Sequence, residues 1–254
     1  MIEVPIEKVA YHYSPRCKIA ELQSHSSISY LEAKALSFIN LIADSAHIPI
    51  SKIGISGSIL IGLASPSSDL DLIIYGIKNA LKVNGKIKKL FEGERFKKYN
   101  TESLKTRYQK RCGESGVSFK DYAFHEQRKY FEGFFDGTEF FVRYVKDQDE
   151  YKEVYGEKVY APVGRAKICG IVEDDSGALF TPCFYGVRDV ETIEGTAAGP
   201  ISGIASFRGR FCQQALTGER VVACGKLERV VHSDKTYYRL IVGNRPEDFM
   251  VTVR

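Results

Sequence analysis

Apolar residues between positions 29 and 47 recur at a helical period, which places them on one face of an α-helix. The members of this run are Leu31, Ala35, Phe38, Ile42 and Ala46. Ser29 and Glu32 have the spacing of a capping box just ahead of the run, and Pro49 follows it. We therefore expect an amphipathic helix over about 29–47.

The pattern then becomes strand-like. Residues 52–56 form a short strand candidate that ends at the dipeptide Gly57-Ser58. A short helix is predicted over 59–64, and alternating apolar positions predict a strand over 70–75. The resulting order is strand, Gly-Ser turn, short helix, strand.

The middle of the chain is basic and then again strand-like. Residues 78–111 have a helical character and many lysines and arginines with few acids. The turn dipeptide Asp136-Gly137 precedes a run of strand formers over 138–145. The polar residues 146–158 are compatible with a short helix or a linker.

From about Tyr160 onward, glycine and β-branched residues dominate. Short strand candidates alternate with turn signals such as Asp175-Ser176-Gly177 and Gly199-Pro200, as in a small barrel or sandwich. We expect an α+β chain with a boundary near 150–160. An α/β domain with a mixed sheet would span 1–155, and a smaller all-β, barrel-like domain would span 156–254.

Composition narrows the class of protein. The 254 residues are 44% hydrophobic and 27% charged, which excludes a disordered or fibrous chain. The net charge of +4 leaves room for an anionic partner such as a nucleotide or RNA. No apolar run approaches the roughly 20 residues that cross a bilayer, and the first residues lack the features of a signal peptide. We expect a cytoplasmic protein that does not associate with membranes.

The six cysteines show neither a CxxC pair nor the spacing of a zinc site. In an intracellular protein of this size, they are expected to be buried thiols.

Two carboxylates on the strand 70–75 are the strongest chemical signal. Asp69 and Asp71 lie two residues apart, so on a strand they share one face. Adjacent carboxylates repel each other, and a divalent cation relieves the repulsion. Oxygen ligands favour Mg²⁺ or Mn²⁺ over zinc. Gly57 allows a phosphate to approach the backbone, the start of the next helix offers free N–H groups, and Ser58 adds a hydroxyl donor.

Residues 54–75, GISGSILIGLASPSSDLDLIIY, resemble the signature of the nucleotidyltransferase superfamily that includes DNA polymerase β, in an archaeal branch. The pattern is a Gly-Ser pair, a spacer and carboxylate–hydrophobic–carboxylate; ten residues, Ile59–Ser68, separate Ser58 from Asp69. The resemblance covers about this segment and does not extend to the C-terminal domain.

The resemblance implies a reaction and a ligand set. Asp69 and Asp71 would be catalytic and bind two Mg²⁺ ions and a nucleoside triphosphate, whose β- and γ-phosphates Gly57 and Ser58 would hold. A third carboxylate on a later strand would be the remaining metal ligand and would activate the acceptor hydroxyl. Glu139 is the first candidate and Asp136 the alternative; the family more often has Asp in mid-strand.

The implied activity is transfer of a nucleoside monophosphate to an acceptor hydroxyl, with release of pyrophosphate. The acceptor could be tRNA, another RNA, a protein side chain or a small molecule. The alternatives are a catalytically silent module of the same fold that binds RNA or a nucleotide, and a phosphohydrolase that uses the same metal pair on water.

Other basic and aromatic residues have two interpretations each. Arg107 and Arg111, four residues apart, could contact phosphate or form a solvated helix face. Arg143 shares the strand face of Glu139 and could pair with a carboxylate or reach a phosphate. The interleaved Arg and Phe of 207–211, and residues 225–230, could bind nucleic acid or reflect ordinary strand alternation.

Overall fold

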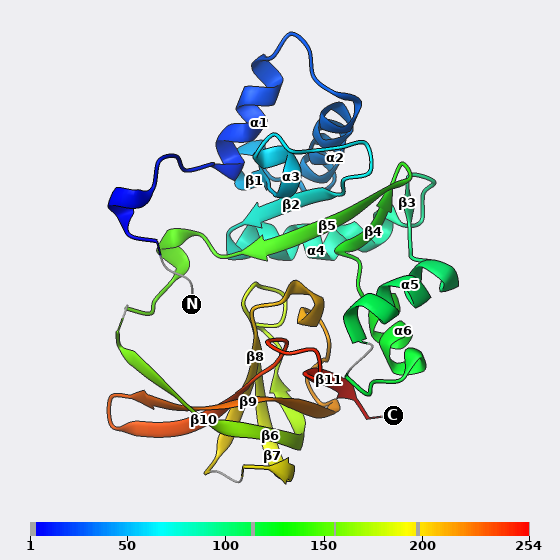
Figure 1. Cartoon of the computed structure of the whole chain (residues 1–254). Coiled ribbons are helices and arrows are strands. Elements are labelled where there is room, and N and C mark those ends of the chain that lie inside the picture. The colour runs from blue at the N-terminus through cyan, green and yellow to red at the C-terminus, as the bar shows by residue number, and fades with distance from the viewer. Residues whose placement is uncertain (1–3, 113–114, 155, 197–198, 254) are drawn as a thin grey trace. The chain divides into compact units, whose positions relative to one another are not determined.

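The computed structural model describes residues 4–112, 115–154, 156–196 and 199–253. These residues form a mixed α+β structure with six α-helices and two mixed sheets, one of five strands and one of six (Figure 1). Contacts within the chain group it into two compact units. The first contains the chain up to Lys98 together with Tyr130–Asp147, and the second contains Tyr99–Lys129 and everything from Gln148 onward.

The sheet of the first unit has the strand order β1-β2-β5-β4-β3. Its strands are β1 (Ile53–Ile55), β2 (Leu70–Tyr75), β3 (Phe96–Lys97), β4 (Glu132–Phe135) and β5 (Thr138–Val145). Its helices are α1 (Pro15–Ser24), α2 (Tyr30–Ala46), α3 (Gly57–Leu60) and α4 (Ile77–Leu90). β2 and β5 run parallel, side by side (Figure 1), and the other neighbours are antiparallel.

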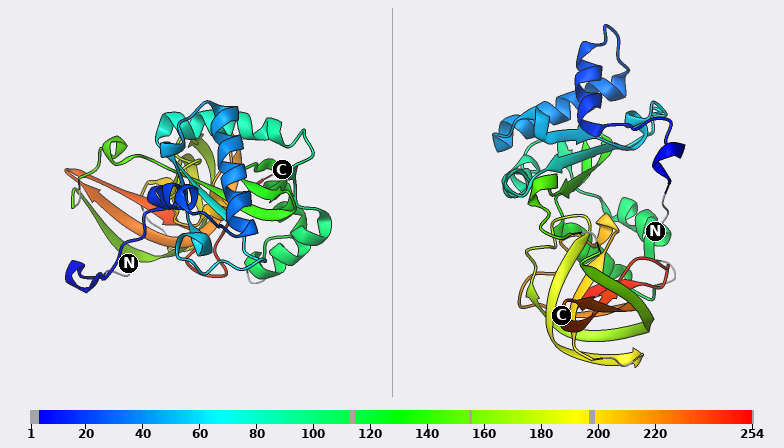
Figure 2. Two further views of the ribbon diagram at one scale, coloured as in Figure 1. Left: turned by 90° about the horizontal axis from the view of Figure 1, so that it is seen from above. Right: turned by 90° about the vertical axis from the view of Figure 1, so that its left-hand side faces the viewer.

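One face of this sheet is the core of the unit. Alternate residues of β2 and β5 are almost fully buried, while the residues between them are half-buried. α2 and α4 pack against each other (Figure 2), and the ring of Phe38 on α2 stacks 4.8 Å from Phe135 and meets Phe140 at 4.9 Å. The buried face is therefore covered by helices, and the polar residues of both strands lie on the opposite face.

Several predicted elements are confirmed. The helix expected over 29–47 is α2, and Ser29 and Glu32 form both hydrogen bonds of the capping box. The strands expected over 70–75 and 138–145 are β2 and β5. The basic segment 78–111 is not one helix, because β3 separates α4 from α5 (Thr101–Cys112).

The sheet of the second unit closes on itself. Its strands are β6 (Lys158–Asp174), β7 (Cys183–Gly195), β8 (Ile201–Ser206), β9 (Arg220–His232), β10 (Lys235–Ile241) and β11 (Phe249–Thr252). Because β10 pairs with both β8 and β9, the strands β6, β7, β8, β10 and β9 form a ring (Figure 2), and β11 extends it from β9. This is the strand pairing of a small barrel.

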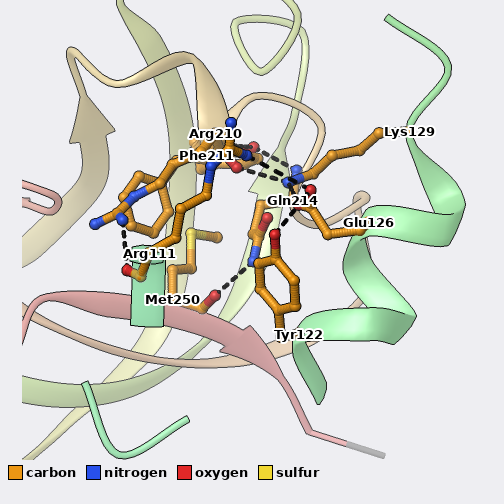
Figure 3. A network of polar contacts seen from close by, with 9 residues as sticks. Arg111, Tyr122, Glu126, Lys129, Arg210, Phe211, Gln214 and Met250 are labelled. Carbon is orange, nitrogen blue, oxygen red and sulfur yellow. Dashed lines mark hydrogen bonds and ion pairs between the residues drawn. The ribbon is translucent and has the colours of Figure 1, made fainter. Parts of the chain in front are cut away.

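Two helices belong to the second unit although they precede its strands. α5 and α6 (Phe119–Arg128) are joined to the barrel by a buried polar network (Figure 3). The Lys129 ammonium donates to Glu126 at 2.7 Å and to the Arg210 carbonyl at 2.6 Å. Arg210 in turn donates to the carbonyl of Arg111 at 2.6 Å. Residues 99–129 therefore group with the second unit, which differs from a single boundary at 155.

The described residues contain no helix long and apolar enough to cross a membrane.

All six cysteines are free. Only Cys183 and Cys212 are buried, whereas Cys17 is exposed and the other three are partly exposed. The expectation of buried thiols is therefore wrong for four of the six.

Candidate functional site

The parallel pairing of β2 with β5 brings the predicted carboxylates onto one surface. Asp71 lies opposite Phe141, and the same register continued by two residues sets Asp69 opposite Glu139. Neighbouring strands are about 4.8 Å apart, and alternate residues share a face. Asp69, Asp71 and Glu139 therefore occupy the sheet face that α2 and α4 leave uncovered.

The Gly-Ser turn lies directly against Asp71. The Ser56 N–H donates to the Asp71 carbonyl at 2.8 Å, and the chain then turns at Gly57 with a φ of 62°. A Cβ at Gly57 would lie 2.2 Å from Asp71 Oδ2, so only glycine fits between the turn and the carboxylate. The helix after the turn, α3, is a single turn of Gly57–Leu60, not the helix predicted over 59–64.

Ser58 has a polar atom available to a ligand. Its Oγ is buried, and no hydrogen-bond partner for it exists among the residues that the structure describes. A buried hydroxyl without a partner costs free energy, and a bound phosphate oxygen next to the Gly57 turn would satisfy it.

The electrostatics link the three carboxylates. Burial, together with the charges of Asp69 and Glu139, raises the pKa of Asp71 to about 6, while the charge of Arg143 acts in the opposite direction. Such a rise in pKa is expected where several carboxylates lie close together and are partly shielded from solvent. The charge of Arg143 thus partly offsets the effect of the two neighbouring carboxylates on Asp71.

The alternative third carboxylate, Asp136, is engaged elsewhere. It lies in the turn between β4 and β5 with a φ of 45°, and Arg95 Nη2 donates to its Oδ2 at 2.5 Å. This hydrogen bond to Arg95 lowers the pKa of Asp136. Lys34 donates to the Asp136 carbonyl at 3.0 Å. Of the two candidates, Glu139 is the one whose charge acts on Asp71.

The carboxylates of this face are oxygen donors of the kind that bind a divalent cation such as Mg²⁺. No group of three or more His, Cys, Asp or Glu side chains in the described part of the chain is arranged to hold a metal ion. Mg²⁺, however, is usually held by one or two carboxylates, with water and substrate phosphates completing its shell. The pair Asp69 and Asp71 fits that requirement, because a cation would favour the ionised form of Asp71.

α1 closes one end of the polar face. The Arg16 guanidinium lies 3.9 Å from the centre of the Tyr75 ring, and a Cβ at Gly54 would lie 2.8 Å from Pro15 Cβ. Asp147 pairs with both Arg16 and Lys52. The end of the face that carries Asp69 and Asp71 lies away from these contacts, at the start of β2.

Two other predicted candidates take part in contacts of the second unit. Arg111 lies 3.6 Å from Glu126, and the Arg107 guanidinium lies 4.0 Å from the ring centre of Tyr99. Within the segment 207–211, Arg210 is tied to the network of Figure 3 and Phe211 is buried, whereas Phe207 is half exposed.

Sequence patterns did not identify a cleft of about 380 Å³ beside α3, lined by Tyr11, Tyr13, Lys18, Glu21 and Leu60–Gly62. The only signal in the sequence was the aromatic pair within Tyr11-His12-Tyr13, which has no helical or strand period of its own.

The chain is similar to a known archaeal protein. The chain is 34% identical over 210 residues to an uncharacterized protein of Methanocaldococcus jannaschii. The match covers 82% of this chain and 60% of the relative, so the chain spans about three fifths of that protein's length. No family model matches the chain. No solved structure matches it.

Proposed function

We propose that the first unit is a nucleotidyltransferase-like domain that moves a nucleoside monophosphate from a nucleoside triphosphate to an acceptor hydroxyl. The observation that carries the proposal is the position of Asp71. Its carboxylate lies against Gly57, and its pKa is raised by burial and by the charges of Asp69 and Glu139. Such an arrangement is costly for the fold and is typical of a functional site.

Each residue has a defined task in this reaction. Gly57 and Ser58 bind the phosphates of the nucleotide, through the exposed backbone of the turn and the buried Ser58 Oγ. Asp69, Asp71 and Glu139 would hold Mg²⁺, which when bound neutralises phosphate charge and polarises the phosphoryl group. Glu139 accepts the proton of the acceptor hydroxyl.

The proposed reaction is an in-line displacement at the α-phosphorus of the nucleotide. The acceptor oxygen forms a bond to the α-phosphorus as the bond from that phosphorus to the bridging oxygen of the β-phosphate breaks. Pyrophosphate leaves with the bonding electron pair. The acceptor proton moves to Glu139 and then to water. RNA, including tRNA, is among the acceptors to test, since the net charge of +4 favours a polyanionic partner.

A second candidate function is a catalytically silent module that binds a nucleotide or RNA. It is favoured by the absence of a ready group of three metal ligands among the described residues. A silent module would bind the nucleotide without turnover.

The test is transfer of label from each α-³²P-labelled nucleoside triphosphate, with Mg²⁺ or Mn²⁺, with and without total RNA of the source organism. The variant is the double substitution Asp69→Ala, Asp71→Ala, and the control is Asp44→Ala, an exposed carboxylate on α2. Label that moves to an acceptor with wild type and control, but not with the double variant, supports the transferase. Saturable binding of nucleotide without any transfer supports the silent module.

A further inference from the structure

The cleft beside α3 has an aromatic wall. The rings of Tyr11 and Tyr13 meet edge to face, with centres 4.7 Å apart and planes at 78°. Tyr11 is 71% and Tyr13 47% exposed. In an edge-to-face pair, one ring keeps both of its faces free of the other. Large exposed aromatic rings beside a cleft are available to stack on a planar ligand.

The cleft lining also contains a polar pair, Lys18 and Glu21. Lys18 Nζ donates to Glu21 Oε1 at 2.6 Å, and the Lys18 side chain is only 11% exposed. An ammonium has three protons, so Lys18 retains donor capacity beyond this bond, and Glu21 retains acceptor capacity. The two side chains together present a donor and an acceptor to a ligand edge.

The cap of α1 and the packing of α1 on β1 hold the lining of the cleft in place. Ser14 caps α1 by accepting from the Cys17 N–H, which fixes the chain immediately after Tyr13. α1 itself packs on β1, where Pro15 meets Gly54. The cleft therefore has a defined position relative to the Gly57 turn.

The cleft continues the candidate site. Its lining includes Leu60, Ile61 and Gly62, a segment that begins two residues after Ser58. Leu60 lies about 5 Å along the helix axis from Gly57, at 1.5 Å per residue. A ribose bridges such a span between a phosphate and its base.

We propose that this cleft binds the base of the nucleoside triphosphate, an inference that rests on the proposed function. Tyr11 or Tyr13 stacks on the face of the base, and Lys18 and Glu21 contact its polar edge. Stacking on an aromatic side chain tolerates every base, because each base has a π face. The base site therefore predicts tighter binding of a nucleoside triphosphate than of bare triphosphate.

The test compares ATP with inorganic tripolyphosphate as competitors of a ribose-labelled fluorescent ATP in the presence of Mg²⁺. The variants are the double substitutions Tyr11→Ala, Tyr13→Ala and Tyr11→Phe, Tyr13→Phe. The matched control is Tyr30→Ala, a tyrosine of the same unit that is 79% exposed.

We expect the alanine variant to bind ATP about tenfold more weakly or worse, as loss of one stacked base predicts. Its affinity for tripolyphosphate should not change, and the phenylalanine variant and the Tyr30 control should bind ATP as wild type does. Equal affinity of wild type and alanine variant for ATP would overturn the base site and leave the proposed function standing. If wild type bound neither ATP nor tripolyphosphate, the proposed function would fail, and the base site with it.

Discussion

Replacing Asp71 by Asn is expected to stabilise the protein at neutral pH while removing its proposed activity. The pKa of Asp71 rises from an ordinary 3.8 to about 6 in the folded chain. Above pH 6 the carboxylate is ionised in both the folded and the unfolded state, and only the folded state bears the cost of burial and repulsion. As the pH falls through 3.8, the carboxyl of the unfolded chain is protonated as well, and the cost disappears.

The size of the effect follows from the same values. A rise from 3.8 to about 6 corresponds to at most about 3 kcal/mol, at 1.36 kcal/mol for each pH unit. Because Asp71 is partly open to solvent, screening reduces this, and we expect about 1–2 kcal/mol. Asn has the same shape and no charge, so the gain in the free energy of unfolding should appear at pH 7.5 and vanish near pH 4.

The assay is urea unfolding in EDTA at both pH values, with Asp44→Asn as the control for loss of an exposed carboxylate. Adding Mg²⁺ should then stabilise wild type and not Asp71→Asn, because the cation relieves the same repulsion. A variant that is less stable than wild type at pH 7.5, or a gain at pH 4 as large as that at pH 7.5, would contradict this prediction.

Three further outcomes are expected. Gly57→Ala should abolish nucleotide transfer, because its Cβ would displace the Asp71 carboxylate. The control Gly137→Ala is also at positive φ but in open space, so it should lose only about 1 kcal/mol of stability and keep the activity. Equal activity of the two variants would contradict this prediction. Lys129→Met should lower the free energy of unfolding by about 3 kcal/mol, because it removes the ammonium 2.7 Å from the buried Glu126 and leaves Arg111 at 3.6 Å. The double variant Glu126→Gln, Lys129→Met should recover part of the loss in urea titrations. Burial, together with the charges of Lys129 and Arg128, lowers the pKa of His125 to about 4. As the pH falls, the unfolded chain therefore takes up a proton first, and stability should fall between about pH 6.5 and 4. His125→Gln should lack that slope in thermal melts, and an unchanged slope would count against this prediction.

The local parts of the candidate site could be predicted from sequence because they depend on short-range rules. Strand alternation alone sets Asp69 and Asp71 on one face, and the Gly57-Ser58 turn has its own signature. The capping box of α2 likewise depends only on the four consecutive residues 29–32. These features need no knowledge of distant contacts.

The remaining features depend on contacts between residues far apart in the chain. Nothing local indicates that β5 lies parallel to β2, which is what sets Glu139 opposite Asp69. The ion pair of Asp136 joins it to Arg95, 41 residues away, and this contact helps to separate the roles of the two candidate carboxylates. The attachment of residues 99–129 to the barrel through Arg210 is equally invisible in the sequence.

The most direct test of the proposed transferase follows the two ends of the nucleotide separately. Wild type would be incubated with Mg²⁺, total RNA and either α-³²P- or γ-³²P-labelled ATP, GTP, CTP or UTP, in parallel with the Asp69→Ala, Asp71→Ala variant. Nucleotidyl transfer would place the α-label in an acceptor and the γ-label in pyrophosphate, in equal amounts and only with wild type. Transfer of the γ-label to an acceptor, release of inorganic phosphate alone, or equal turnover by the variant would contradict it.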